Sequence, residues 1–234
     1  MSTNSDNRAM GENLRALIEV RIHAYDLLRR NFWQEPSPEF LQSLIQTEQM
    51  TSFPFSDESS LIAEGAKDVT SYLNELKPLR DETFDQLHWD YTRLFIGPNK
   101  LAAPPWESAY LNEDRLLFQE ETLQVRRAYL KYNFLPKDYG HEADDHLGLE
   151  LDFMYQLGLL SLDALNSENC EDVTAIHRDQ REFLKGHLLK WINQFSQTVI
   201  QSANTDFYKG MAKILSGFLS LDLKALEELS AIEI

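Results

Sequence analysis

The densest group of side chains that could do chemistry lies in one short stretch, HEADDHLGLELDF, at positions 141–153. Three acids crowd the expected first turn of a helix, where the helix dipole favours negative charge: Glu142, Asp144 and Asp145. His146 and Glu150 follow four residues apart, so they share one face of that helix. Such a group could cap the helix, hold a metal ion or accept guanidinium groups.

A metal-dependent enzyme could use four side chains of this stretch: Glu142, Asp145, His146 and Glu150. A histidine and a carboxylate at this spacing can share an ion. The pattern does not match common metal-binding motifs, because the Glu-x-x-His pairs of ferritin-like sites are absent. The zincin spacing is also absent, since His146 lies five residues after His141. We therefore expect no metal and no catalytic residue, and a metal-dependent enzyme stays the alternative.

The same acids could instead bind arginine. A carboxylate accepts two parallel N–H bonds from a guanidinium group, and this geometry selects arginine over lysine. Helix capping and arginine binding are compatible, because a carboxylate has spare lone pairs. An acidic helix start therefore suits a ligand that carries arginines.

A long loop, IGPNKLAAPPWESAY at positions 96–110, holds the second group. Such long loops are uncommon in compact domains and are usually functional or disordered, and the aromatic content here argues against disorder. Tyr91 and Phe95 share a helix face just before the loop. A Pro-Pro pair extends the backbone, and Trp106 offers a rigid face with one N–H donor. Together with Tyr110 they could form an apolar groove for a peptide; alternatively, Trp106 fills the core.

Composition limits the class of partner. The 234 residues include 38 acidic and 22 basic side chains, which gives a formal net charge of −16. This charge repels phosphate backbones and anionic lipid surfaces and attracts cationic peptides, although it could also serve solubility alone. The single cysteine, Cys170, excludes an internal disulfide and fits a reducing compartment. We expect no nucleic-acid partner and, because no apolar run approaches roughly 20 residues, no membrane span.

The stretch LRRNFW, at positions 28–33, looks like the core of a twin-arginine export signal. Such a signal continues directly into an apolar segment. This chain continues instead as QEPSPEF, which is polar and broken by prolines. We therefore interpret the stretch as the end of a helix.

Helical periodicity runs through almost the whole chain. Between about Met10 and Trp33, one stripe recurs every three or four residues: Leu14, Leu17, Ile18, Arg21 and Tyr25. Ser37 and Pro38 restart a helix, with serine as the cap and proline at the first helical position. A helix from about 81 to 95 should end at Gly97-Pro98, because proline cannot continue it. No alternating strand pattern is evident, so the predicted fold class is all-α.

We predict a single globular helical domain, residues 1–234, of about eight to ten helices. The stretch NFLPKDYGH, at 133–141, is rich in turn residues and is the best hinge candidate. It suggests an N-terminal half of about 10–132, a hinge of about 133–143 and a C-terminal half of about 144–234. Exchange of the halves between two copies would form a domain-swapped dimer, so monomer and swapped dimer both stay open.

Two motifs together resemble the TorD/DmsD family. The first is Tyr91-x-x-Leu94-Phe95-x-Gly97-Pro98, continuing to Pro104-Pro105-Trp106-Glu107-Ser108-x-Tyr110, and the second is Glu142-x-x-Asp145-His146-x-x-x-Glu150-Leu151. The likeness extends from about Ala24 to Leu219, and the two motifs in combination are specific. Ala143 departs from a common proline, which could loosen the hinge, and Ala109 replaces a usual valine.

The resemblance implies a cytoplasmic, all-helical chaperone of anaerobic respiration that has no catalysis and no cofactor of its own. Its partner would be the twin-arginine leader of the apo-form of a molybdenum-containing oxidoreductase, which it shields from premature export and helps to mature before cofactor insertion. The residues that match the family's leader-binding and hinge motifs are Tyr91, Phe95, Gly97, Pro98, Pro105, Trp106, Ser108, Tyr110, Glu142, Asp145 and His146. A third alternative is an oligomeric adaptor without leader specificity.

Overall fold

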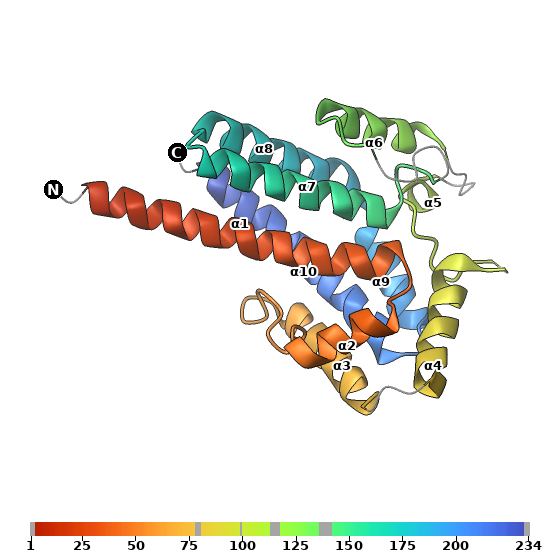
Figure 1. Cartoon of the computed structure of the whole chain (residues 1–234). Helices are drawn as coiled ribbons and strands as arrows, with labels where there is room; N and C mark the ends of the chain where they lie inside the picture. Colours follow the sequence, from red (N-terminus) through yellow and green to blue (C-terminus); the bar gives the residue numbers. More distant parts are fainter. Residues whose placement is uncertain (1–2, 78–80, 99, 113–117, 136–141, 232–234) are drawn as a thin grey trace.

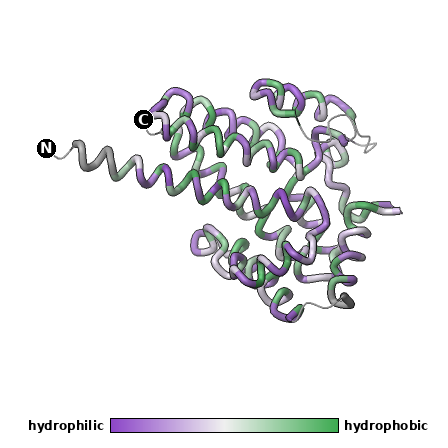
Figure 2. Tube along the Cα trace, in the orientation of Figure 1, coloured by the Kyte–Doolittle hydropathy of each residue, from purple (hydrophilic) through white to green (hydrophobic). Residues whose placement is uncertain are grey.

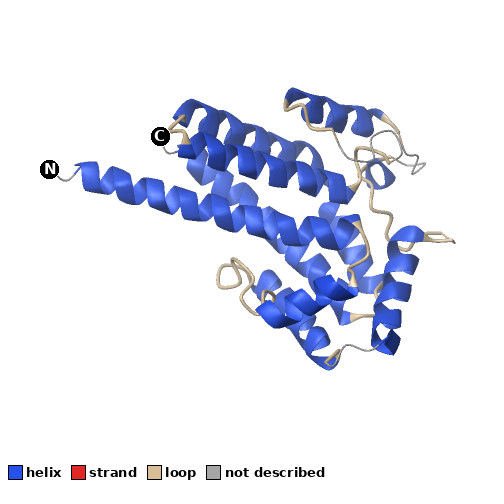
Figure 3. Ribbon diagram, in the orientation of Figure 1, coloured by secondary structure: helices blue, strands red, loops and turns tan. Residues whose placement is uncertain are grey.

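The computed structural model describes residues 3–77, 81–98, 100–112, 118–135 and 142–231. Within these ranges the chain is helical and contains no strand, so the all-α prediction is confirmed (Figure 3). The helices are α1 (Thr3–Trp33), α2 (Pro38–Thr47), α3 (Ser60–Glu75), α4 (Asp81–Tyr91), α5 (Ser108–Leu111), α6 (Glu120–Lys131), α7 (Leu147–Asn166), α8 (Cys170–Phe183), α9 (Leu189–Ser202) and α10 (Asp206–Ala231). Single π-helical turns follow α4 (Thr92–Ile96) and α8 (Leu184–Leu188).

The predicted helix boundaries around the site are confirmed with two differences. The first is that α7 begins at Leu147 and His146 is its N-cap, so Glu142, Asp144 and Asp145 precede the helix and do not form its first turn.

Helix α1 ends at Trp33, and Ser37 caps α2 by accepting a hydrogen bond from the Phe40 N–H at 3.2 Å. The second difference is in the helix that starts at 81, which continues to Ile96 but has a last turn that is π-helical rather than α-helical. Gly97 ends it with a φ of 108°, a conformation that glycine adopts without steric cost.

Helix α10 occupies the centre of the molecule and packs against α3, α8 and α9, while α1 and α7 lie side by side (Figure 1). Apolar and polar residues alternate along the helices, as expected for amphipathic elements around a shared core (Figure 2). Helices α3 and α10 approach each other closely at two glycines: a Cβ on Gly65 would lie 2.5 Å from the carbonyl oxygen of Gly210. Among the described helices, none combines the length and apolarity that crossing a bilayer requires.

The stripe predicted along α1 is buried, including its charged member. Arg21 is only 1% exposed; its guanidinium pairs with Asp222 of α10 and donates to Oε1 of Gln180 of α8 at 3.0 Å. The hydroxyl of Tyr25 donates to the same Asp222 carboxylate at 2.7 Å. Leu14 and Ile18 are buried as well, whereas Leu17 is half-buried. A buried charge is tolerated when it is paired and hydrogen-bonded, and here the ion pair and Gln180 together join three helices.

The predicted hinge, about 133–143, lies in large part outside the described residues, because 136–141 are not among them. The division into two halves therefore stays a prediction. Helices assigned to different halves are in contact, since α1 packs on α7 and α3 packs on α10. The main hydrophobic cluster accordingly contains buried side chains from both, such as Leu28 and Phe218.

Candidate functional site

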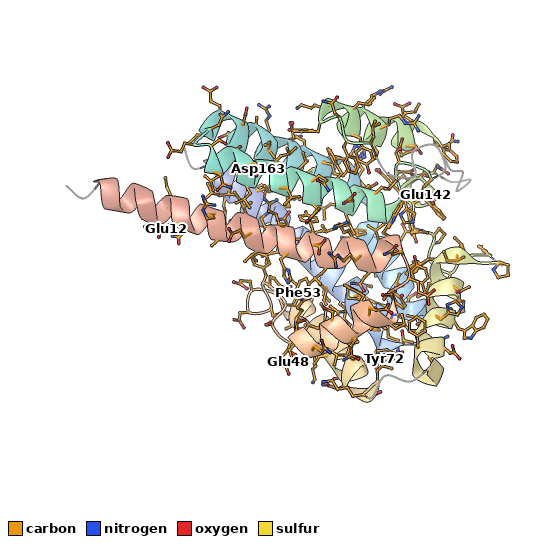
Figure 4. All side chains as sticks on the ribbon, viewed as in Figure 1. Glu12, Glu48, Phe53, Tyr72, Glu142 and Asp163 are labelled. Atoms are coloured by element: carbon orange, nitrogen blue, oxygen red, sulfur yellow. The ribbon has the colours of Figure 1, made fainter. Side chains whose placement is uncertain are left out.

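A groove of about 370 Å³ opens where α1 ends, and we call it the aromatic groove. Its lining is Trp33, Tyr91, Phe95, Ile96, Trp106, Glu142 and His146. Five of these residues belong to the two motifs singled out in the sequence, and only Trp33 and Ile96 do not. The groove therefore brings together α1, α4, the π turn, the long loop and the segment before α7. Figure 4 labels Glu142 beside the start of α7.

Backbone hydrogen bonds hold the long loop against the segment that precedes α7. The N–H of Glu107 donates to the carbonyl of Asp145 at 3.0 Å, and the N–H of Leu147 donates to that of Pro105 at 2.8 Å. The two bonds form an isolated antiparallel bridge centred on Trp106. The two motifs thus meet through their backbones, and Trp106 of the first lines the same groove as Glu142 and His146 of the second.

Trp106 lines the groove and is fixed there by a carboxylate. Its Nε1–H donates to Oε1 of Glu142 at 2.8 Å, and the N–H of Ala143 donates to the same oxygen at 3.0 Å. Within the described chain, Oε2 of Glu142 has no hydrogen-bond partner. Both side chains are half-buried, so Trp106 does not fill the core. The groove consequently presents one carboxylate oxygen beside an indole face.

His146 contributes a neutral polar group. Its Nδ1 accepts the N–H of Gly148 at 3.0 Å, which caps α7, and burial lowers the pKa of the imidazole to about 3. Since Nδ1 accepts, the proton is on Nε2, which is a donor without a partner among the described residues. The ring makes edge contacts with Trp33 at 5.2 Å and Trp106 at 5.6 Å between centroids.

Gly148 explains why Trp33 joins the groove. A Cβ at Gly148 would lie 2.6 Å from the Cα of Trp33, so only glycine lets the end of α1 approach the start of α7 this closely. The periodicity placed Trp33 at the end of a helix but did not predict that it would pack against Gly148. Ile96 is 65% exposed and directly precedes Gly97. An apolar residue next to a helix-ending glycine is the sequence feature that could have identified Ile96 as part of the groove.

Two of the predicted acids lie behind the groove. Asp145 is fully buried: Oδ2 accepts the N–H of Ser108 at 2.9 Å, and Oδ1 accepts the hydroxyl of Thr122 at 2.8 Å. Asp144 is 1% exposed and forms an ion pair with Arg126. Asp145 therefore connects the start of α5 to α6, and both its oxygens are engaged within the fold.

The remaining predicted residues do not line the aromatic groove. Gly97 and Pro98 line a smaller hollow of about 150 Å³ beside Trp89 and Arg93. Ser108 is buried, and Tyr110 stacks on Trp191 with 5.4 Å between ring centroids and 30° between ring planes. Pro105 is buried and contributes its carbonyl to the bridge.

A buried acid pair lies deeper than the groove. Glu150 is fully buried against the carboxylate of Glu107 and the indole of Trp191, without a well-formed hydrogen bond to either. Burial raises the pKa of Glu150 well above its ordinary value, and the charges of Glu107 and Asp145 raise it further. Oε2 of Glu107 contacts Nδ1 of His187 at 2.9 Å.

The four residues of the metal alternative therefore face different surroundings. Glu142 faces the groove, Asp145 is hydrogen-bonded behind it, His146 caps α7, and Glu150 lies in the core. Among the described residues, no group of three histidine, cysteine, aspartate or glutamate side chains is arranged to hold a metal ion.

The fold and the groove define an all-helical binding protein with an aromatic, acidic site. The family model described as "Nitrate reductase delta subunit" matches residues 59–197, which is more than half of the chain. The chain belongs to this family.

Its curated relatives are chaperones. Chaperone protein TorD of Aliivibrio salmonicida is 29% identical over 213 residues, covering 91% of this chain and 97% of the relative. Chaperone protein TorD of Vibrio cholerae is 27% identical over 221 residues, covering 94% of this chain and 98% of the relative. The probable Tat proofreading chaperone DmsD of Haemophilus influenzae is 27% identical over 186 residues, covering 80% and 81%. The TorD/DmsD resemblance is confirmed, and the chain is a chaperone of this kind rather than an enzyme.

Proposed function

We propose that this chaperone binds the twin-arginine leader of the apo-form of a molybdenum-containing oxidoreductase in the aromatic groove. Binding holds the leader back from export while the client matures and receives its cofactor, which places the chaperone in the cytoplasm. The observation that carries the proposal is the lining of the groove: four aromatic side chains, one available carboxylate oxygen and no lysine or arginine.

Each part of such a leader has a complementary surface in the groove. The apolar segment packs on the aromatic rings, and a guanidinium can stack on an indole face while it donates to Oε2 of Glu142. Nε2–H of His146 is a neutral donor for a backbone carbonyl of the peptide. The formal net charge of −16 attracts the cationic end of the leader.

The predicted residues that do not line the groove take a positioning role in this proposal. Asp145 and Ser108 fix the loop after Trp106, and Pro105 anchors it to α7. Gly97 and Pro98 end the π turn that carries Phe95 and Ile96. Their substitution would alter the shape of the groove without removing a contact to the leader.

Calorimetric titration with two synthetic leaders tests the proposal. One carries the arginine pair and an apolar segment, and in the other both arginines are lysine. We expect at least tenfold weaker binding of the lysine leader, because lysine cannot form the bidentate pair. Glu142→Gln should weaken binding of the arginine leader about tenfold, in line with about 1.5 kcal/mol for a charged hydrogen bond. It should also reduce the difference in affinity between the arginine and lysine leaders.

The matched control is Glu19→Gln, which removes the same charge from an exposed position of α1. It lies 14 residues before Trp33, or about 21 Å along the helix. This variant should bind both leaders as the unaltered chain does. Absence of binding to every member of a panel of twin-arginine leaders would contradict the proposed function.

A further inference from the structure

A second carboxylate, Glu35, lies in the connection between α1 and α2, two residues after Trp33. Its oxygens contact Nδ1 of His88 of α4 at 2.8 and 3.0 Å. The Glu35 side chain is 28% exposed and that of His88 is 41% exposed. No lysine or arginine pairs with Glu35 among the described residues. The carboxylate of Glu35 is therefore accessible to solvent, and the contacts described for it are both with one ring nitrogen of His88.

Tyr91 connects this pair to the aromatic groove. It lies three residues after His88, so the two side chains share a face of α4, and Tyr91 lines the groove. Burial raises the pKa of the Tyr91 hydroxyl, and the charges of Glu35 and Glu142 raise it further. Glu35 itself does not line the groove, but it lies next to it in the fold, because Trp33 is two residues before it and Tyr91 shares a helix face with its partner His88.

The contact with histidine leaves Glu35 open to a better partner. A partly exposed ion pair contributes little to stability, because water screens it. An arginine offers two parallel N–H donors, one for each carboxylate oxygen, whereas His88 offers one nitrogen to both. An incoming guanidinium would therefore displace the imidazole at a small cost to the fold.

Two neighbouring arginines need two separate acceptors, and the two carboxylates come from different segments of the chain. Successive side chains of an extended peptide point to opposite sides, so an arginine pair needs acceptors on two walls of a groove. Glu142 belongs to the segment before α7, and Glu35 belongs to the α1–α2 connection beside α4. We propose that Glu35 is the second guanidinium receptor of the groove: one arginine of the pair binds Glu142, and the other replaces His88 on Glu35. The inference rests on the proposed leader-binding function.

Measuring how the unaltered chain and a set of variants bind four leaders tests this assignment. The leaders carry Arg-Arg, Arg-Lys, Lys-Arg and Lys-Lys, and the first variants are Glu35→Gln, His88→Gln and the exposed control Glu19→Gln. Glu35→Gln should weaken the Arg-Arg leader at least tenfold. His88→Gln should bind it as tightly as the unaltered chain or more tightly, because the carboxylate is freed. Glu19→Gln should change nothing.

The single-lysine leaders assign each arginine to one acceptor. Glu35→Gln should weaken binding least for the leader in which lysine already replaces the arginine that faces Glu35, because lysine keeps the charge but not the two parallel N–H bonds. Glu142→Gln should likewise have its smallest effect on the other single-lysine leader. Far-UV circular dichroism of each variant checks that the helices are retained, and Glu35→Asp, which keeps the charge but shortens the reach, should lie between the unaltered chain and Glu35→Gln.

Three results would overturn the inference. If the unaltered chain prefers Arg-Arg and Glu35→Gln has the same preference, leader binding stands and Glu35 is not a receptor. If Glu35→Gln and His88→Gln weaken binding equally, the pair is structural and its carboxylate is not the receptor. If the unaltered chain binds none of the four leaders or of a wider panel, the proposed function fails and this inference fails with it.

Discussion

Glu142 and Glu150 lie eight residues apart in the sequence and have opposite surroundings. One oxygen of Glu142 binds the Trp106 indole and the other faces the groove. Glu150 is fully buried beside a second carboxylate, so its charged form is disfavoured and its pKa is raised. The first side chain can therefore receive a cation, whereas the second affects how stability depends on pH.

We expect Glu150 to make the protein less stable as pH rises. Below the ordinary pKa of 4.5, Glu150 is protonated in both the folded and unfolded states. Above it, the unfolded chain loses the proton while the folded chain keeps it, so stability falls until pH reaches the raised folded pKa. The isosteric Glu150→Gln variant has no carboxyl group to titrate, so it does not lose stability in this way. The difference in unfolding free energy between the variant and the unaltered chain should therefore grow in favour of the variant by up to about 1.4 kcal/mol for each pH unit.

Urea unfolding of both chains between pH 5 and pH 8 measures this difference. The comparison cancels the contributions of His146 and His177, whose lowered pKa values make stability change with pH in the opposite direction. The exposed Glu19→Gln variant should show no such trend relative to the unaltered chain. A difference between Glu150→Gln and the unaltered chain that does not change with pH would disprove the assignment.

The groove depends on how α4 is attached to the core. Asp90 of α4 is 1% exposed, and its carboxylate accepts the backbone N–H groups of Asn204 and Thr205 at 2.8–3.1 Å, just before α10 starts. Helix α10 in turn meets α3 at the glycine contact. The wall that carries Tyr91 is therefore connected to the central helix and, through it, to α3.

Gly65→Ala should destabilise the protein by forcing α3 and α10 apart. Its Cβ would lie 2.5 Å from a backbone oxygen, which cannot move without shifting a helix, and overpacking of this kind costs about 1–3 kcal/mol. Gly11→Ala in α1 is the matched control, because nothing lies within 4 Å of its Cβ. Alanine there should be neutral or stabilise by up to about 1 kcal/mol. Thermal unfolding of the two variants measures both effects; equal melting temperatures would contradict the close contact.

The formal net charge of −16 acts on the molecule as a whole. Within the described chain, some basic side chains pair with acids on other helices, as Lys213 does with Asp68 and Arg21 with Asp222, and others pair within their own helix, as Arg30 does with Asp26. Because acidic side chains outnumber basic ones, the electrostatic potential around the protein is negative. Such a field accelerates the encounter with cationic peptides more than it strengthens the final complex.

Leader association should therefore slow as salt concentration rises. Between ~0.05 and ~0.5 M salt the Debye length shortens from more than 10 Å to less than 8 Å, so long-range attraction is screened. Stopped-flow measurements should show the association rate constant falling severalfold, with a smaller change in the dissociation rate constant. A leader with glutamine in place of both arginines is the control. The same salt response for both leaders would show that attraction to the arginines does not govern the encounter.

Local chemistry was sufficient to predict the helices and much of the groove. The 3.6-residue periodicity identified the buried stripe of α1, and Ser37 and Gly97-Pro98 marked a helix start and a helix end, because caps and breakers act within one turn. Tyr91, Phe95, Trp106, Glu142 and His146 were singled out by residue type and spacing, and all five line the groove. The family resemblance followed from the same motifs.

Which of the acids face the groove was decided only by tertiary structure. The bonds that bury Asp145 come from Ser108 and Thr122, which are 37 and 23 residues away, and no local pattern encodes such pairings. Trp33 joins the site because Gly148 admits it, and Glu35 meets His88 across 53 residues. Periodicity reports the face that a residue occupies on its own helix, whereas the partner across the fold depends on how whole helices pack.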